Sequence, residues 1–416
     1  MVMNYRVIEE ETYIPIPAES LIEGTTLTFP VFISERDVYI QFFERGSRFN
    51  GPEKALLGEK NLSEVFIMMS DAPAYELYRA VQRRGEGGET VFRDSLSPGY
   101  VGQKEEYFPI DRSFMVEGLG ISFSLFRLVD QAFVLLAEAT PVSTLILSTE
   151  LVSLPGAFFI KKDDLALYHE LLNGMMAVTV EPGSVAWSLR VSAIRENAKV
   201  IMSCLIDNPR SGERIKESKE IVGSLVDCVF RSNDAIANML SLKTYDYYTY
   251  AHSVNVAVLS IGLGVALGLK RPEVETLGIG ALLHDIGKSF IPHKILNKQG
   301  RLDDSEFEIM KTHVTEGERI LLDHQDIPAK ALDTVLQHHE KLSGRGYPYG
   351  RSGNEIGLFG RVSAIADCYD ALTTNRPYKT AFSPYKALSI ITGEKGDYDP
   401  GLLRLFISML GKIHLQ

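Results

Sequence analysis

The sequence contains few of the residues that stabilise secreted proteins. Only three cysteines, Cys204, Cys228 and Cys368, occur among 416 residues, and their wide spacing gives no disulfide framework. Such cysteine usage is typical of a reducing cytosol. Residues 1–11 hold an arginine and three glutamates, so the sequence gives no sign of a signal peptide. We therefore expect a cytoplasmic protein.

The chain also lacks a basic run and a long apolar run. Its net charge is −11, which argues against a nucleic-acid polymer as partner. The most apolar stretch, residues 253–269, is short for a membrane span and holds Asn255 and several glycines. We interpret it as a buried core helix and expect no membrane span. With 45% hydrophobic residues, the chain is long enough for two or three domains.

An internal repeat occupies the first 180 residues. The pattern at residues 12–17 recurs at 106–111, and each copy continues into a Glu-Gly pair and a β-rich run. This offset of 94 residues indicates two copies of a small domain rather than a solenoid. We predict two α+β modules, at residues 1–90 and 100–180, each with about three strands and two helices. Residues 83–98 would form the linker.

Neither copy contains a recognisable catalytic cluster, so we expect a regulatory or oligomeric role for both, with a signal that the sequence does not identify. After a break at residues 181–184, helical spacing predicts two long helices, at 186–205 and 213–240. They would form the first layer of a helical domain at 185–416, or a stalk (185–240) for a homodimer, or both.

The C-terminal half is organised around the stretch at residues 281–288, Ala-Leu-Leu-His-Asp-Ile-Gly-Lys. His284 and Lys288 are four residues apart, so on a helix they would share a face. Imidazole with carboxylate, here from Asp285, is a ligand set for a transition metal ion, and a lysine offers a point charge for phosphate. A single His-Asp pair, however, is more often a core histidine beside a surface aspartate.

Further motifs change that balance. In chain order they contain His252, His313, the pair His338 and His339 followed by Glu340, a Gly-Arg-Gly-Tyr-Pro stretch at 344–348, and Asp367 with Asp370. Together with His284, they account for five of the nine histidines. Their order and spacing resemble the HD-GYP family, a branch of the HD-domain metal phosphohydrolases. The resemblance extends from about residue 196 to the C-terminus.

The resemblance implies an all-α bundle at 185–416 with a binuclear metal centre. One ion would be held by His252, His284, Asp285 and Asp367, and Asp285 would bridge to a second ion held by His313, His338 and His339. A set rich in imidazole suits iron, manganese, nickel or zinc better than magnesium, with iron the family's best-supported metal and manganese next. We expect two ions rather than three, because Tyr248 stands where some members carry an extra glutamate.

The same resemblance assigns roles in catalysis and substrate binding. Asp285 and Lys288 would be catalytic, with Lys288 holding a substrate phosphate rather than being a solvated lysine at a helix end. Candidate substrate-binding residues are Lys288, Arg345, Tyr347, Arg361, Asp370, Arg376 and Lys379. Each of the arginines, and Lys379, could equally be a plain salt-bridge residue. In the family, the Gly-Tyr-Pro loop also contacts partner proteins, so a diguanylate cyclase-type partner is a candidate.

The function implied is hydrolysis of cyclic di-GMP, a bacterial second messenger, under regulation by the N-terminal repeats. The product is linear pGpG, and the sequence leaves open whether hydrolysis continues to GMP. A hydroxide bridging the two ions would attack phosphorus in line. Two alternatives stay open: another 3′,3′ cyclic dinucleotide as substrate, because the sequence does not specify the bases, and a catalytically slow receptor. A generic HD nucleotide phosphatase is disfavoured by the Gly-Tyr-Pro loop.

Overall fold

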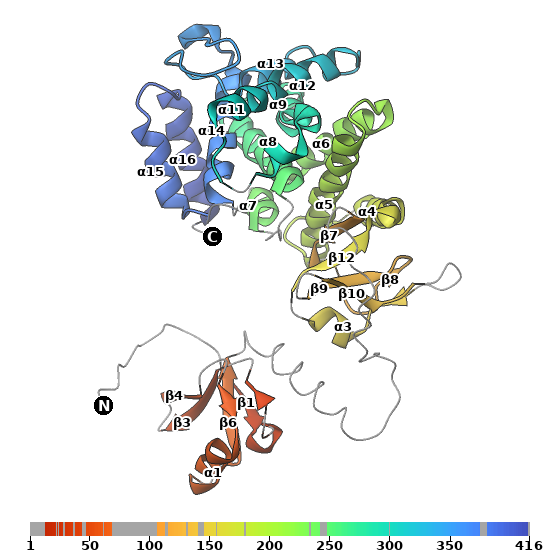
Figure 1. Ribbon diagram of the computed structural model, residues 1–416, viewed down its shortest axis with the longest axis vertical. Coiled ribbons are helices and arrows are strands. Elements are labelled where there is room, and N and C mark those ends of the chain that lie inside the picture. The colour runs from red at the N-terminus through yellow and green to blue at the C-terminus, as the bar shows by residue number, and fades with distance from the viewer. Residues whose placement is uncertain are drawn as a thin grey trace.

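The computed structural model describes residues 13–68, 106–374 and 381–414, with short gaps inside these ranges at 22, 24, 28–29, 36–37, 44–46, 61, 113–114, 130–131, 140–144, 155, 179, 233, 242–247 and 299. Strand-rich structure precedes a helical region that reaches the C-terminus (Figure 1). The predicted linker at 83–98 lies outside the described residues.

The first strand-rich module contains an antiparallel sheet of four strands in the order β1-β6-β3-β4. These strands are β1 (Tyr13–Pro17), β6 (Glu64–Met68), β3 (Val31–Glu35) and β4 (Val38–Phe43). A ribbon of β2 (Thr25–Thr26) with β5 (Arg48–Phe49), the short helix η1 (Ala18–Ser20) and α1 (Gly51–Glu59) complete the described part. Val65 and Ile67 alternate with more exposed neighbours along β6 and enter the module's own core, as expected for a half-buried strand.

The second module contains an antiparallel sheet in the order β10-β9-β12-β7. Its elements are β7 (Tyr107–Ile110), β8 (Gly120–Ile121), β9 (Leu125–Val129), β10 (Ala132–Ala137), β11 (Leu145–Ile146), α3 (Thr149–Ser153), β12 (Phe158–Lys161), η6 (Lys162–Asp164) and α4 (Leu165–Ala177). Strands β8 and β11 form a separate two-stranded ribbon.

The two sheets share one strand order, because β1-β6-β3-β4 corresponds to β7-β12-β9-β10 read from its other edge. Each strand of the second sheet begins 94 residues after its counterpart in the first. This agreement supports the predicted duplication. The strand count was underestimated: each main sheet has four strands where about three were expected. The two-stranded ribbons, β2 with β5 and β8 with β11, were not predicted either, because two-residue strands are too short to leave an alternating pattern.

The helical region begins at Val185, after Ser184 caps the first helix by accepting a hydrogen bond from the amide of Trp187. Its elements are α5 (Val185–Asp207), α6 (Gly212–Arg231), α7 (Asp234–Ser241), α8 (Tyr248–Ala266), α9 (Arg271–Leu283), η7 (Ile286–Phe290), α10 (His293–Leu296), α11 (Asp304–Lys311), α12 (His313–Leu322), α13 (Ala331–Gln337), η8 (Gly353–Glu355), α14 (Leu358–Thr373), α15 (Pro384–Gly393) and α16 (Pro400–His414).

One expected helix is divided in two. Residues 213–240 form α6 and α7, because Ser232 adopts an extended conformation and ends α6. Serine, with the neighbouring asparagine and aspartate, favours caps and turns over helix interiors. The apolar stretch at 253–269 lies mostly in α8, which packs against α9, α14 and α5 in the interior of the bundle. Among the helices described, none is both long and apolar enough to span a membrane.

Helix α5 belongs to two hydrophobic cores at once. Ala193 and Val200 pack in the core of the second module, whereas Ile194 and Ile201 pack in the core of the helical bundle. Residues 191–203 are buried without exception, so this part of α5 offers no face to a second chain. Helix α5 therefore forms the first layer of the bundle and also closes one side of the second module's core (Figure 1).

This shared layer predicts how truncations affect stability. Deleting residues 1–105 should leave the melting temperature of the remaining chain within a few degrees. Deleting residues 1–182 exposes the module-facing side of α5, and lost burial costs about 1.5–3 kcal/mol for each large apolar side chain. We expect that fragment to melt at least about 5 °C lower than the shorter truncation. Thermal unfolding followed by circular dichroism tests this, and equal melting temperatures would contradict it.

Candidate metal centre

Seven histidine and aspartate side chains from five segments converge within the helical bundle. Helix α8 carries one, the end of α9 two, the start of α12 one, the end of α13 two and α14 one; in that order they are His252, His284, Asp285, His313, His338, His339 and Asp367. Six are buried and His339 is half-buried. These are the residues that the sequence predicted as metal ligands.

The turn after α9 directs Asp285 into this cluster. Helix α9 ends at Leu283, and the chain then forms the short helix η7. His284 and Lys288 therefore do not share the face of one continuous helix, contrary to expectation. Gly287 makes the turn possible, because a Cβ atom there would lie 1.9 Å from the carbonyl oxygen of His313. The glycine thus lets η7 approach α12 and brings two ligand-bearing segments into contact.

Backbone carbonyl groups orient three of the histidines. The Nδ1 atoms of His284, His313 and His338 lie 2.7, 2.7 and 2.9 Å from the carbonyl oxygen three residues earlier. A carbonyl oxygen can only accept, so each Nδ1 carries the proton. The Nε2 atoms, which face the cluster, are then free of protons. An unprotonated ring nitrogen is the form that binds a metal ion.

His252 is oriented differently, by side chains. Its Nδ1 donates to Asp370 Oδ2 at 2.7 Å, and its Nε2 lies 3.1 Å from Asp367 Oδ1. Asp370 is only 3% exposed, and its Oδ1 accepts hydrogen bonds from Asn255 and Thr374. Both carboxylate oxygens are thus bonded within the protein. We therefore correct the assignment of Asp370 to substrate binding: it holds the ring of His252.

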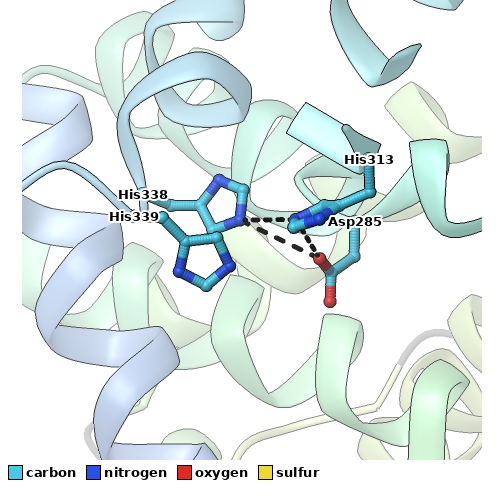
Figure 2. A group of neighbouring side chains, drawn as sticks. All are labelled: Asp285, His313, His338 and His339. Carbon is cyan, nitrogen blue, oxygen red and sulfur yellow. Dashed lines mark hydrogen bonds and ion pairs between the residues drawn. The ribbon is translucent and has the colours of Figure 1, made fainter. Parts of the chain in front are cut away.

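Asp285 lies between two groups of ligands. Its Oδ1 is 3.3 Å from Nε2 of His313 and 3.9 Å from Nε2 of His338, as Figure 2 shows. Its Oδ2 is 3.2 Å from Nε2 of His284 and 3.6 Å from Nε2 of His252. Each carboxylate oxygen thus faces a different set of imidazoles. This is the geometry that a bridging carboxylate needs, although the bridging role itself remains a prediction.

The donor set fits a divalent transition metal. Two groups of ligand atoms each lie within 4.8 Å of one another: one contains Asp285, His313, His338 and His339, and the other contains His252, His284 and Asp367. Within the described part of the chain, His284 Nε2 and Asp285 Oδ1 are buried without a hydrogen-bond partner. A buried polar atom left unpaired costs about 1–3 kcal/mol. A cation bound between these atoms would remove that cost.

The protonation states of His338, His339 and Asp285 suit cation binding. Burial lowers the pKa of His338 to about 3 and holds the pKa of His339 well below its usual range, so both are neutral near pH 7. Burial raises the pKa of Asp285, but its contacts with His284 and with the ammonium group of Lys288 outweigh that effect and hold the pKa well below its usual range. His252 differs from these residues. Burial lowers its pKa, but hydrogen bonds to Asp367 and Asp370 outweigh burial and raise the pKa to about 10.

Lys288 lies against the cluster rather than in open solvent. Its Nζ is 2.5 Å from Asp285 Oδ2, and its side chain is largely buried. The ammonium group therefore partly neutralises the carboxylate between the two ligand groups. Its predicted contact with a substrate phosphate would require Nζ to face both Asp285 and the substrate, and this remains a prediction.

The Gly-Tyr-Pro loop lies over one side of the cluster. The ring centroids of Tyr347 and His339 lie 4.6 Å apart. The ring of Phe307 is nearly perpendicular to that of Tyr347, at a centroid distance of 6.0 Å. Gly346 is required here, because a Cβ atom would lie 2.5 Å from the carbonyl oxygen of His339. Tyr347, predicted to bind substrate, thus presents an aromatic ring next to the predicted ligands.

Glu340 fixes the same loop, a role that the sequence analysis did not assign. It is buried, and its carboxylate accepts hydrogen bonds from the amides of Tyr349 and Arg351 at 2.8 and 2.9 Å. Asn255 was also missed, although it lies one turn after His252 on the same helix. That spacing on α8 was the available signal, since residues three apart on a helix share a face.

The predicted substrate cations have different positions. Arg361 donates to the carbonyl oxygens of Ile356 and Gly353 and to Asp399, so its guanidinium is held by the protein, and we correct its assignment to a structural role. Arg345 pairs with Asp397 at 2.8 Å, but its side chain is 71% exposed. Arg376 and Lys379 lie outside the described residues, and so does the side chain of Tyr248.

Residues 234–402 match the family model of the HD domain, and this part of the chain therefore belongs to the HD domain family. The more particular resemblance to HD-GYP proteins stays a resemblance, and the curated relatives and one solved structure agree with it. A cyclic di-GMP phosphodiesterase of Pseudomonas aeruginosa is 38% identical over 216 residues, which cover 51% of this chain and 52% of that protein. A cyclic di-GMP phosphodiesterase of Thermotoga maritima is 36% identical over 196 residues, 47% of this chain and 53% of that one.

A 3′3′-cGAMP-specific phosphodiesterase of Vibrio cholerae is 41% identical over 145 residues, 35% of this chain and 31% of that protein. The chain thus spans about half the length, or less, of these curated relatives. An HDG"Y"P protein from Bdellovibrio bacteriovorus superposes with a TM-score of 0.51 at 16% identity, over 96% of this chain and all of the other. This likeness concerns the fold alone.

The pKa shifts predict how the stability of the metal-free protein depends on pH. Unfolded histidines titrate near pH 6.5. The lowered pKa values of His338 and His339 stabilise the fold above that pH, and this contribution is lost as the pH falls. The raised pKa of His252 stabilises it below pH 6.5, and this contribution is lost as the pH rises toward 10. Stability should therefore peak near pH 6.5.

Melting temperatures of chelator-treated protein at pH 5, 6.5 and 9 test this prediction. A steady rise in melting temperature from pH 6.5 to 9 would contradict the raised pKa of His252. His293→Gln is a matched control, because this exposed histidine lies outside the cluster and its loss should leave the profile unchanged.

Proposed function

We propose that this chain is a metal-dependent phosphodiesterase that hydrolyses cyclic di-GMP to a linear product, either pGpG alone or pGpG and then GMP. The observation that carries the proposal is the carboxylate of Asp285, which separates two groups of ligand atoms and has a lysine ammonium beside it. The relatives named cyclic di-GMP phosphodiesterases support the same substrate class.

The chain's own residues divide the work. The seven side chains of the two groups would hold two divalent ions, iron first and manganese next. When bound, such a pair activates the attacking water and neutralises charge that develops on the phosphoryl oxygens. Lys288 would orient the scissile phosphate. The ring of Tyr347 would stack on a base, a contact worth about 1–3 kcal/mol and tolerant of base identity.

A second candidate substrate is 3′,3′-cGAMP. One relative with this named specificity is 41% identical over 145 residues, a level comparable with the cyclic di-GMP phosphodiesterases. A stacking contact does not distinguish guanine from adenine, so the choice of base would rest on polar contacts to the base edges. Parallel assays with both dinucleotides decide between the two candidates.

The two strand-rich modules are, in this proposal, copies of one domain that regulate the catalytic domain at 185–416. Their common strand order and the offset of 94 residues support a duplication. The domain bounds 1–90 and 100–180 belong to the proposal. The predicted homodimer and the diguanylate cyclase-type partner at the Gly-Tyr-Pro loop stay predictions.

Replacing the bridging carboxylate tests the function directly. Asp285→Asn should lower hydrolysis of cyclic di-GMP by more than about 100-fold. Replacing a residue that only hydrogen-bonds a metal ligand already lowers metal affinity or activity about 10- to 100-fold, and loss of a bridging ligand should cost more. The protein is purified without oxygen, its metals are measured, and products are separated by chromatography. Asp326→Asn, an exposed aspartate, should retain full activity. Near-normal turnover of Asp285→Asn at full metal content would refute the bridging role.

Lys288→Ala separates substrate binding from metal binding. Metal content should not fall, because the ammonium group competes with a cation for Asp285 Oδ2. A hydrogen bond to a charged group contributes about 1.5–3 kcal/mol, so kcat/KM should fall about 10- to 100-fold. Lys294→Ala, which removes an exposed lysine on α10, is the matched control. Loss of metal from Lys288→Ala, measured by elemental analysis, would contradict its assignment to phosphate.

A further inference from the structure

A buried arginine on α5 is linked to the metal centre. Arg195 is 1% exposed and lies outside the segment 234–402 that matches the HD domain. Its Nη2 donates to Asn255 Oδ1 at 3.1 Å. Asn255 Nδ2 in turn donates to Asp370 Oδ1 at 2.8 Å, and Asp370 Oδ2 accepts from His252 at 2.7 Å.

The direction of every hydrogen bond in this series is determined. An arginine only donates, so the amide of Asn255 must turn its oxygen to Arg195 and its nitrogen to Asp370. An ionised carboxylate only accepts, so His252 must donate from Nδ1. The series thus keeps the Nδ1 proton of His252 directed at Asp370 and leaves Nε2 as the ring nitrogen that faces Asp367 and would bind an ion. Hydrogen bonds of this kind fix both the ring and the basicity of a metal-binding histidine.

The next residue of α5 connects this series to the second module. Glu196 is fully buried, and its Oε1 accepts hydrogen bonds from the amide of Asp111 and the hydroxyl of Tyr168, both at 3.1 Å. Its Oε2 accepts from Lys199 at 2.7 Å. One turn of α5 therefore carries both the contact with the module and the support of His252.

Arg195 is costly to bury. Its Nε and Nη1 atoms have no hydrogen-bond partner among the described residues. Burial lowers its pKa, and the surrounding carboxylates Glu196, Asp111 and Asp370 counter the effect. Burying an arginine with unpaired donors lowers the stability of the fold. Such a residue is therefore expected to have a role other than stabilising the fold. Orienting Asn255, and through it Asp370 beside His252, is such a role.

His252 differs in this respect from the other buried histidines of the centre. His284, His313 and His338 are held by carbonyl oxygens of their own helices, so their orientation follows from local backbone geometry. Only His252, among these four, depends on side chains from other helices. It is therefore the ligand whose position can respond to a change elsewhere in the molecule.

We propose that Arg195 is a positioning residue for the metal centre: through Asn255 and Asp370 it fixes the ring of His252, and it couples this ligand to the second N-terminal module. The inference rests on the proposed metal centre but not on hydrolysis, since a metal-binding receptor would need the same support. Its test therefore measures metal binding.

The whole chain is freed of metal with a chelator and then titrated stepwise with Co²⁺. Visible absorption and calorimetry measure the affinities of the two proposed sites separately. Arg195→Met should weaken one binding step about 10- to 100-fold and leave the other within about twofold. The affected ion is the one held by His252, His284 and Asp367. Arg195→Lys, which keeps the charge, should recover part of the loss. Arg190→Met is the matched control, because this arginine of α5 bonds a carbonyl oxygen of α4 instead.

Two further variants keep the test decisive if Arg195→Met does not fold. Asn255→Ala removes the middle of the series and should weaken the same step. Tyr168→Phe removes a donor to Glu196 and should weaken that step by a smaller factor, about two- to fivefold. Combined with Asn255→Ala, it should have no additional effect, since both act through the same series.

Unchanged binding in both Arg195→Met and Asn255→Ala, or equal weakening of both steps, would overturn the inference alone. Additive losses from Tyr168→Phe and Asn255→Ala would overturn the coupling to the module. A wild-type chain that binds no Co²⁺ would overturn the inference and the proposed metal centre together.

Discussion

The buried carboxylate of Asp285 is the constraint on which the rest of the bundle depends. It lies among four imidazoles and one ammonium group, and each of its oxygens faces a different pair of histidines. An ionised carboxylate in such a place is stable only with positive charge around it. The end of α9, the turn through Gly287 and the start of α12 place His284, the ammonium group of Lys288 and His313 around this carboxylate.

Much of the site could be predicted from the sequence, because ligand types and their spacing along helices are local features. The side to which a carboxylate turns is not. Asp367 and Asp370 occupy one helix face, yet Asp367 enters the cluster and Asp370 bonds the far side of His252. Arg361 likewise bonds acceptors brought near by loop folding. Such roles depend on tertiary contacts that no single stretch of sequence contains.

The strand-rich half shows the same limit. The repeat was visible because corresponding strands preserve their apolar pattern, and the strands of the two main sheets start at a constant offset of 94 residues. The two-residue strands pair only within their ribbons, β2 with β5 and β8 with β11. They are too short to show an alternating apolar pattern in the sequence. Helix α5 showed the opposite difficulty: its sequence predicts a helix but not that both of its sides are covered, by two different cores.

The position of α5 limits how strongly the second module can influence the metal centre. A module shifts the affinity of a distant site only by the free energy that its contacts gain in one state over another. Besides apolar packing, the described contacts at Glu196 are two hydrogen bonds to a buried carboxylate, each worth about 1.5–3 kcal/mol. Losing one of them could change the affinity of the metal centre by at most roughly 10- to 100-fold, and only the part of that energy that reaches His252 would be seen. That range suits graded regulation of metal occupancy, because the three histidines held by backbone carbonyls retain their orientation while His252 alone responds.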